Sequence, residues 1–232
     1  MKKNHQQNHI FCEKCRNMNT SLIKFCTQQQ VENVNYAKTC SSYKRGDVLF
    51  HEGGLPLGIF CLNSGSVKIV KAASGGKEQI VRIATSGDII GYRSLLMRQR
   101  YSASAIATED CKVCLIPKEE FMKLTMENPK FYDALIERLC KELEDSQNKM
   151  ADIAYKPVRG RLAEALLLLS QASQNGLINL TREDLASFIG TVKETTIRLL
   201  SEFKDEGLIE IDRRSIRLLN TAGLEKVSNI YD

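Results

Sequence analysis

Residues 181–200 read TREDLASFIGTVKETTIRLL, two short helical patterns separated by one glycine. Thr181 and Asp184 have the spacing of a capping box, in which two side chains satisfy backbone N–H groups at a helix start. Gly190 follows the last apolar residue of the first pattern, and glycine often ends a helix because it adopts the left-handed conformation at little cost. The stretch therefore predicts two helices joined by a tight turn.

The second predicted helix is apolar on one side only. Its buried side is indicated by residues at helical spacing, namely Thr196, Leu199, Leu200 and Phe203. Its other side carries Lys193, Glu194, Ile197, Arg198 and Ser201. One buried stripe opposite a polar side is typical of the recognition helix of a helix-turn-helix, which enters the major groove of DNA. A helical hairpin with a solvated face gives the same pattern and is the alternative.

A β-hairpin is predicted directly after the helix pair. Residues 208–220, LIEIDRRSIRLLN, alternate in polarity and turn at Asp212, Arg213 and Arg214. This turn would be the basic tip of a wing that contacts DNA phosphates. The whole chain has a net charge of +5, but from residue 156 onward it has eleven basic and eleven acidic residues. DNA binding therefore depends on the local arrangement of charge and not on bulk charge.

The middle of the chain has the pattern of a small β-domain. From residue 43 to residue 116, short runs of β-forming residues are separated by glycine-containing turns about ten residues apart. The runs are DVLFHE, IFCLN, VKIVKA, QIVRIA, DIIGY, SASAIAT and KVCLIP. This spacing predicts a sandwich or a roll.

A long helix with a heptad repeat follows the β-domain. Between residues 129 and 155 the apolar positions alternate in steps of four and three residues, as in a coiled-coil seam. The seam consists of Tyr132, Ile136, Leu139, Leu143, Met150 and Ile153, interrupted by the polar Ser146. The pattern favours a homodimer through two copies of this helix, and packing of the helix on its own domain is the alternative. Pro157 ends the helix and marks a domain boundary.

These patterns divide the chain into four parts. We expect an N-terminal cysteine-containing segment and helix in residues 1–30, a β-roll sensor in 31–127, a dimerisation helix in 128–155 and a winged helix-turn-helix in 156–232. No apolar run approaches the roughly 18 to 20 residues that span a bilayer, and the N-terminus lacks the apolar stretch of a secretory signal. We therefore expect a cytoplasmic protein with no membrane partner, whose eight cysteines are reduced thiols.

In their order and spacing, these features resemble the Crp/Fnr family of bacterial transcription regulators over nearly the whole chain. The resemblance rests on KRGDVLFHEGG, SGSVKIVK, SGDIIGYRSLL, the long helix before VRGRLAEALL, and LTREDLASFIGTVKETTIRLLSEFKDEGLIEI. It implies an α+β fold with an N-terminal double-stranded β-helix (a jelly-roll-like β-roll), a long dimerisation helix and a C-terminal winged helix-turn-helix. It also implies that a homodimer binds a palindromic promoter site in double-stranded DNA and contacts RNA polymerase.

The resemblance also implies roles for residues of the recognition helix. It places Glu194 where family members accept a hydrogen bond from cytosine, and Arg198 where they hold guanine; both pairings suit the base edges of the major groove. Lys193 is expected to reach a phosphate or another base, and Ile197 a thymine methyl group. The full set of expected DNA contacts is Thr181, Lys193, Glu194, Ile197, Arg198, Ser201, Arg213 and Arg214.

The family's cyclic-nucleotide pocket implies effector positions in the β-roll. In the family a glutamate after a glycine binds the ribose, and an arginine before a Ser-Ala pair binds the cyclic phosphate. Here Tyr92 follows Gly91, and Tyr101 precedes Ser102. A buried phosphate without a cation is costly, and the neighbouring arginines lie one residue away, on the other face of a strand. Cyclic AMP is therefore disfavoured. The candidate effector residues are Gly91, Tyr92, Tyr101, Ser102 and Ser146.

The cysteines indicate a different signal. Cys12 and Cys15 form a C-x-x-C pair, Cys26 follows, and Cys114 lies in VCLIP. The oxygen-sensing branch of the family has an N-terminal cysteine cluster and one cysteine in a similar strand, which together hold a [4Fe–4S] cluster. Four thiolates are the right number for such a cluster. The wide gap before Cys26 departs from that pattern and puts this ligand in doubt.

Two other uses of these cysteines stay open. One is a zinc site, and the other is a C-x-x-C pair without a metal. The residues available to complete a zinc site are His5, His9 and Cys40. The remaining cysteines, Cys61, Cys111 and Cys140, are expected to be packing residues or spare thiols.

Other classes of protein fit the sequence less well. A cupin-like metalloenzyme needs clustered histidines inside the roll, and of the three histidines only His51 lies there. The sequence also has no nucleophile elbow, phosphate loop or zinc-protease helix, so we expect no enzymatic activity. A cyclic-nucleotide-like signalling module without DNA binding is the second alternative. Glu194, Arg198 and the wing arginines argue against it.

Overall fold

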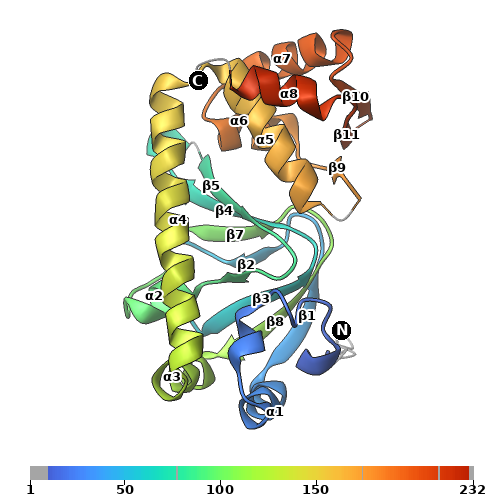
Figure 1. Ribbon diagram of the computed structural model, residues 1–232. Helices are drawn as coiled ribbons and strands as arrows, with labels where there is room; N and C mark the ends of the chain where they lie inside the picture. Colours follow the sequence, from blue (N-terminus) through green and yellow to red (C-terminus); the bar gives the residue numbers. More distant parts are fainter. Residues whose placement is uncertain (1–9, 77, 174, 214, 230–232) are drawn as a thin grey trace, which may run out of the picture. The chain divides into compact units, whose positions relative to one another are not determined.

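The chain divides into two compact units. The first contains residues 1–71 and 83–142, and the second contains residues 72–82 and 143–232. The computed structural model describes residues 10–76, 78–173, 175–213 and 215–229 (Figure 1).

Two four-stranded sheets form the β-roll (Figure 1). The strands are β1 (Thr39–Tyr43), β2 (Val48–Phe50), β3 (Gly58–Ser64), β4 (Val67–Ala72), β5 (Glu78–Ala84), β6 (Ile89–Ile90), β7 (Ser104–Ala107) and β8 (Cys111–Pro117). One sheet has the order β1-β8-β3-β6, and the other has the order β2-β7-β4-β5. Strands β2 to β8 coincide with the seven predicted runs, so the prediction of a roll is confirmed.

Strand β1 is not predicted by its own sequence. TCSSY shows no alternation of apolar and polar residues, and its side chains are exposed or half-buried. It pairs antiparallel with β8 over its full length, with Thr39 opposite Leu115 and Tyr43 opposite Cys111. Since β-structure depends strongly on neighbouring strands, this pairing explains a strand that the local pattern does not show.

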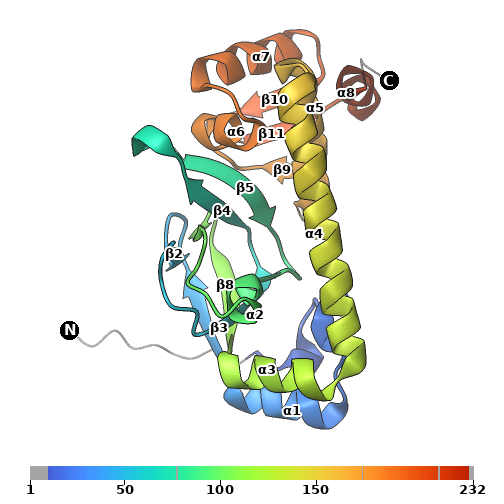
Figure 2. The same cartoon turned by 90° about the vertical axis from the view of Figure 1, so that its left-hand side faces the viewer.

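The first unit also contains several helices. They are η1 (Cys12–Lys14), η2 (Leu22–Phe25), α1 (Gln28–Ala37), α2 (Tyr92–Leu96), α3 (Lys118–Glu127) and the start of α4 (Pro129–Tyr155). Helix α1 begins at a capping box, in which Thr27 Oγ1 accepts from the Gln30 N–H and Gln30 Oε1 accepts from the Thr27 N–H. Helices α1 and α3 lie side by side (Figure 2).

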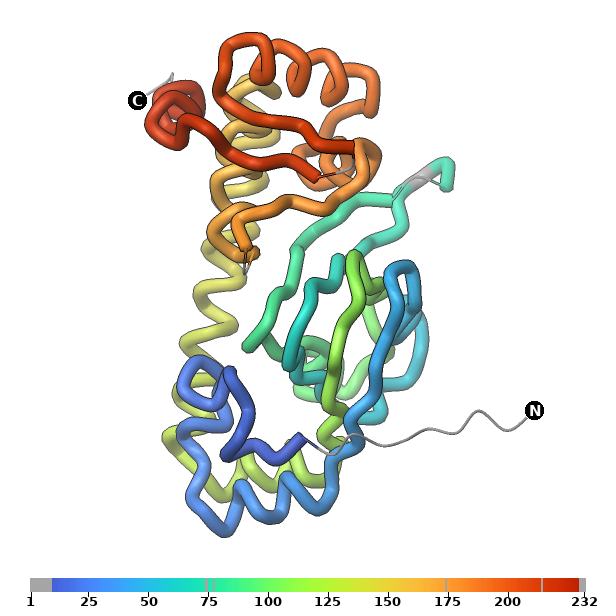
Figure 3. Tube along the Cα trace, turned by 90° about the vertical axis from the view of Figure 1, so that its right-hand side faces the viewer, coloured from blue at the N-terminus to red at the C-terminus, as the bar shows by residue number. Residues whose placement is uncertain are grey.

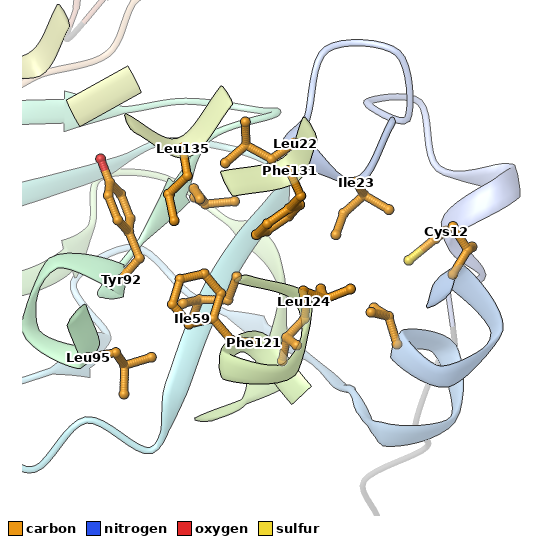
Figure 4. Close-up of a cluster of buried hydrophobic side chains, with 14 residues drawn as sticks. Cys12, Leu22, Ile23, Ile59, Tyr92, Leu95, Phe121, Leu124, Phe131 and Leu135 are labelled. Carbon is orange, nitrogen blue, oxygen red and sulfur yellow. The ribbon is translucent and has the colours of Figure 1, made fainter. Parts of the chain in front are cut away.

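A hydrophobic cluster joins the N-terminal segment to these helices and to β3 (Figure 4). Phe131 and Leu135 of α4 are fully buried in it, together with Phe121 of α3. Cys12 and Tyr92 lie at opposite ends of the cluster in the view of Figure 4. The first part of helix α4 therefore packs on the first unit mainly through residues outside the heptad seam, and Leu139 is the seam residue that also contacts this cluster.

The second unit contains a three-stranded sheet and a group of helices. Its elements after α4 are α5 (Val158–Ala172), β9 (Leu177–Ile178), α6 (Arg182–Ile189), α7 (Lys193–Asp205), β10 (Ile209–Asp212), β11 (Ser215–Leu218) and α8 (Thr221–Ser228). The sheet order is β10-β11-β9, and α5 packs against α8. The predicted hairpin of β10 and β11 is confirmed. Strand β9 and helix α8 are additions that the sequence patterns did not single out.

Candidate nucleic-acid interface and sensor sites

Helix α6 begins and ends at the residues that the sequence predicts. The Thr181 hydroxyl accepts from the Asp184 N–H at 2.9 Å and donates to Asp184 Oδ2 at 2.7 Å. Gly190 is the C-cap, with φ of +70° in the left-handed region. Arg161 of α5 donates to the carbonyl oxygen of Ile189 at 2.6 Å, at the end of α6. This arginine, which the sequence analysis did not single out, holds the turn between α6 and α7.

Helix α7 has the two faces that the sequence predicts. Thr196, Leu199, Leu200 and Phe203 are all buried. Lys193, Glu194, Ile197, Arg198 and Ser201 are all exposed. The Thr196 hydroxyl donates to the carbonyl oxygen of Val192, which satisfies the one polar group of the buried face. The helix is therefore held by one stripe, and substitutions on the exposed face leave its packing intact.

Acidic residues hold the arginines around α7. Arg198 Nη1 lies 2.5 Å from Glu202 Oε1 one turn further along the helix, and its side chain is 67% exposed. Arg159 of α5 pairs with Glu202 at 3.0 Å and with Glu206 at 2.6 Å, and its guanidinium lies 4.7 Å from the centre of the Phe203 ring. Because exposed ion pairs contribute only about 0.2 to 1 kcal/mol, Arg198 can exchange Glu202 for another acceptor at small cost.

The turn of the wing presents one described arginine. Asp212 and Ser215 face each other at the end of the β10–β11 ladder, and Arg213 occupies the turn with φ of +50° and an exposed side chain. Arg214, the other predicted tip residue, lies outside the described residues. Arg217 on β11 is also exposed and lies opposite the exposed Glu210 of β10.

Tyr101, at the predicted phosphate position, packs against other aromatic side chains. Tyr101 is 5% exposed, and its ring stacks on Phe50 with centroids 3.9 Å apart. The Phe60 ring is tilted against Phe50, with centroids 5.4 Å apart. Gly91 has φ of +87°, and an added Cβ there would lie 3.4 Å from the Tyr101 ring. Burial raises the pKa of Tyr101 to about 12, so its hydroxyl is neutral at physiological pH.

The other candidate effector residues have different surroundings. Tyr92 is buried in the separate cluster that contains the N-terminal segment, and Ser102 and Ser146 are exposed. The guanidinium of Arg100 donates to the carbonyl oxygen of Gly53 at 2.9 Å from an exposed position. The residues present at the predicted phosphate position therefore do not fit a buried cyclic phosphate.

The N-terminal segment, dark blue in Figure 3, brings several cysteines together. Cys12, Cys15, Cys61 and Cys114 line one small pocket. Lys38 also lines this pocket and is only 6% exposed. Its ammonium group lies 2.8 Å from Cys12 Sγ. Cys61, which the sequence predicts to be a packing or spare thiol, is thus a member of this pocket. Burial raises the pKa of Cys61 to about 12.

Three of the four predicted cluster ligands, Cys12, Cys15 and Cys114, line this pocket, but Cys114 is not a free thiol. Cys114 forms a disulfide with Cys40, which corrects the expectation that all eight cysteines are reduced; the direct pairing of β1 with β8 brings the two together. Cys26 does not line the pocket and packs against the hydrophobic cluster instead. Within the described residues, no group of three or more histidine, cysteine or acidic side chains is arranged to hold a metal ion. His5 and His9 lie outside the described residues.

The two remaining cysteines, Cys111 and Cys140, do not line the pocket. Cys111 is buried, and its thiol donates to the carbonyl oxygen of Ser66 at 3.2 Å, whereas Cys140 is exposed on α4. Among the described residues, no helix is both long enough and apolar enough to cross a bilayer.

Two family models match the chain. A model of the cyclic nucleotide-binding domain matches residues 40–128, and a model of the Crp-like helix-turn-helix domain matches residues 160–227. Together they cover more than half of the chain, in the order of a sensor followed by a DNA-binding domain.

Individual relatives match over most of their length. The transcriptional activator protein FnrA of Stutzerimonas stutzeri is 26% identical over 226 residues, which is 94% of this chain and 92% of the relative. The cyclic AMP receptor protein of Thermus thermophilus is 27% identical over 80% of this chain and 86% of the relative.

Solved structures share the fold. FixK2 from Bradyrhizobium japonicum superimposes with a TM-score of 0.75 at 23% identity, over 82% of this chain and 96% of that one. A transcriptional regulator of the Crp/Fnr family from Eubacterium rectale gives a TM-score of 0.72 at 20% identity, over 90% of this chain and 99% of that one.

Proposed function

Since the chain belongs to the Crp/Fnr family of transcription regulators, we propose that it binds a palindromic promoter site as a homodimer. A signal received in the β-roll and N-terminal segment controls its affinity for DNA. The observation that carries this proposal is the exposed face of α7, which presents Glu194 and Arg198 one helical turn apart above a fully buried stripe. A carboxylate accepts from cytosine N4, and a guanidinium donates to guanine O6 and N7, so this face suits a guanine-containing half-site.

The contacts around α7 divide into base and phosphate contacts. Lys193, Ile197 and Ser201 share the exposed face with the two readout residues and complete the contact with the major groove. Arg213 at the wing tip contacts a phosphate. Thr181 contributes chiefly through the start of α6, because its hydroxyl is engaged with Asp184.

The dimer forms through the heptad seam of α4. Leu143 is 60% exposed, Met150 69% and Ile153 43%, so these apolar side chains lack cover within the described protomer. Two such stripes packed together would bury each other, and the two-fold axis between them would place the recognition helices on successive turns of DNA.

The signal is distinct from cyclic AMP in this proposal. In the sequence Tyr101 stands where the family has its phosphate-binding arginine, and its ring stacks on Phe50, so this position offers no positive charge to pair with a cyclic phosphate. FnrA of Stutzerimonas stutzeri is among the relatives, and an iron–sulfur cluster held by Cys12, Cys15, Cys26 and Cys114 stays a prediction. Anaerobic purification with iron and sulfide analysis tests it. An iron-free protein that still binds DNA would remove the cluster from the proposal.

Partners and location follow from the family. The regulator acts in the cytoplasm, contacts RNA polymerase at its promoters, and has no enzymatic activity of its own in this proposal. The family is one of transcription regulators and not of enzymes.

Selection from a random double-stranded library tests the function as a whole. The full chain, under reducing and oxygen-free conditions, is expected to enrich inverted repeats whose half-sites contain guanine, with centres about 34 Å apart or a multiple of that distance. Enrichment of a single unrepeated site would argue against the dimer. No enrichment under either reducing or oxidising conditions would favour a signalling module that does not bind DNA.

A further inference from the structure

Three cysteines lie at the same level across three neighbouring strands. In the sheet β1-β8-β3-β6, Cys114 of β8 is directly opposite Cys40 of β1 on one side and Cys61 of β3 on the other. Residues paired across an antiparallel sheet project from the same face, with Cβ atoms roughly 4.5 to 5.5 Å apart. Cys114 therefore has one cysteine neighbour on each side.

The two neighbours are not equivalent. The Cα atoms of Cys40 and Cys114 are 4.1 Å apart, which matches the close spacing of a non-hydrogen-bonded pair. A residue in a central antiparallel strand directs its N–H and C=O to one neighbour only, so Cys61 and Cys114 form the hydrogen-bonded pair, whose side chains are further apart. A disulfide needs Cβ atoms about 3.5 to 4.5 Å apart. The backbone thus selects Cys40 over Cys61 as the partner of Cys114.

Cys114 also faces the pocket lined by Cys12, Cys15 and Cys61. A sulfur atom within a disulfide has no thiolate electron pair to give to a metal or to attack an electrophile. Any use of Cys114 in the sensor region therefore requires its bond with Cys40 to be absent.

We propose that Cys40 and Cys114 form a reversible disulfide, made by hydrogen peroxide or a related hydroperoxide, that withdraws the Cys114 thiol from the sensor pocket. This inference rests on the proposed function in taking the N-terminal region as the sensor. In the first step one thiolate attacks a peroxide oxygen, the O–O bond breaks, and a sulfenic acid and hydroxide form. The second thiolate attacks that sulfur, the S–O bond breaks, and water leaves after protonation. The two thiols lose two electrons in total, and the peroxide is reduced to two waters.

The disulfide also acts on the structure around β1. This strand is the edge of its sheet and follows α1 directly in the chain. Between them lies Lys38, which contacts Cys12 Sγ and Asn35 Oδ1, both at 2.8 Å. The bond between Cys40 and Cys114 therefore links β1 covalently to the central strand β8. Lys38, which contacts Cys12, lies two residues before Cys40 in the same stretch of chain.

Peptide mapping of the full-length protein tests the proposal directly. The reduced protein is treated with hydrogen peroxide, alkylated, digested with trypsin and analysed without reduction. Trypsin places Cys40 in TCSSYK and Cys114 in VCLIPK, while Cys61 and Cys111 fall in other peptides. We expect peroxide to join TCSSYK to VCLIPK, with loss of two titratable thiols, and dithiothreitol to restore both.

Three variants make the result specific. Cys40→Ser, in a strand that already contains Ser41 and Ser42, should leave Cys114 open to alkylation after peroxide treatment. Cys61→Ser and the exposed Cys140→Ser should still form the TCSSYK–VCLIPK link. A link from VCLIPK to the Cys61 peptide in comparable yield, or peroxide-treated wild type with both thiols free, would overturn the proposal. The mapping measures thiols and not DNA affinity, so it stands or fails separately from the proposed function.

Discussion

At the scale of single residues, Arg198 and Arg213 are expected to make different kinds of DNA contact, Arg198 to a base and Arg213 to a phosphate. Arg198 lies on the exposed face of α7 and is held by Glu202, whereas Arg213 lies at the turn of the wing. Arg198→Ala should weaken binding by about 1 to 3 kcal/mol per half-site and relax the choice of base at one position, because a bidentate contact to guanine is lost. Binding-site selection and fluorescence anisotropy on wild type and variant measure both effects.

Arg213 provides the comparison within the same domain. Arg213→Ala should weaken binding to all sequences alike and reduce the slope of log affinity against log salt by roughly one per lost phosphate contact. Arg93→Ala, an exposed arginine on α2 of the β-roll, should change neither quantity. If the wing variant shifts the preferred base while Arg198→Ala lowers affinity evenly, the two roles are assigned to the wrong residues.

At the scale of elements, the contribution of the capping box of α6 to stability can be tested directly. Thr181→Ala removes the acceptor of the Asp184 N–H and should lower the free energy of unfolding by about 1 kcal/mol, within the range measured for such caps. Thr181→Ser keeps the hydroxyl and should retain most of the stability. Urea unfolding followed by circular dichroism measures the difference. Equal stability of the three proteins would show that the cap contributes nothing.

The elements also show what the sequence can and cannot predict. Helices α6 and α7 were predicted from Thr181, Gly190 and the buried stripe of α7, because caps and helical spacing are local signals. Strand β1 was missed, because TCSSY becomes a strand only by pairing with β8. The disulfide was missed for the same reason, since the register that places Cys40 opposite Cys114 is a property of the sheet and not of either segment.

The candidate sites divide in the same way. The exposed face of α7 follows from periodicity alone, whereas the surroundings of each sulfur depend on contacts far apart in the chain. Lys38 reaches Cys12 from 26 residues away, and Arg161 reaches the end of α6 from another helix. The resemblance suggests Cys26 as a cluster ligand although its spacing departs from the family pattern, and in the structure Cys61 lines the pocket whereas Cys26 does not. Such long-range arrangement has no signature in one sequence.

At the scale of the whole molecule, the decisive property is the dimer. Leu139 is partly buried against the hydrophobic cluster of its own protomer, so it is a poor site for a test of association. Leu143 and Met150 are exposed seam positions with the same heptad register. Changing both to Lys should produce monomers, because each charge would face its like across the seam and the apolar area buried there would be lost.

Light scattering and sedimentation of the full-length protein measure the oligomeric state. Asn148→Lys with Ala151→Lys adds the same charge to the same helix on positions that point away from the seam, and it should remain dimeric. Circular dichroism confirms that both double variants keep their helices. The seam variant should also lose affinity for a palindromic site much more than for an isolated half-site, because one protein then contacts one half-site without help from a partner. A seam variant that remains dimeric would place the interface elsewhere on the chain. If the seam variant is a monomer in solution but still prefers the palindrome as strongly as wild type, recognition of the palindrome does not depend on dimerisation through α4.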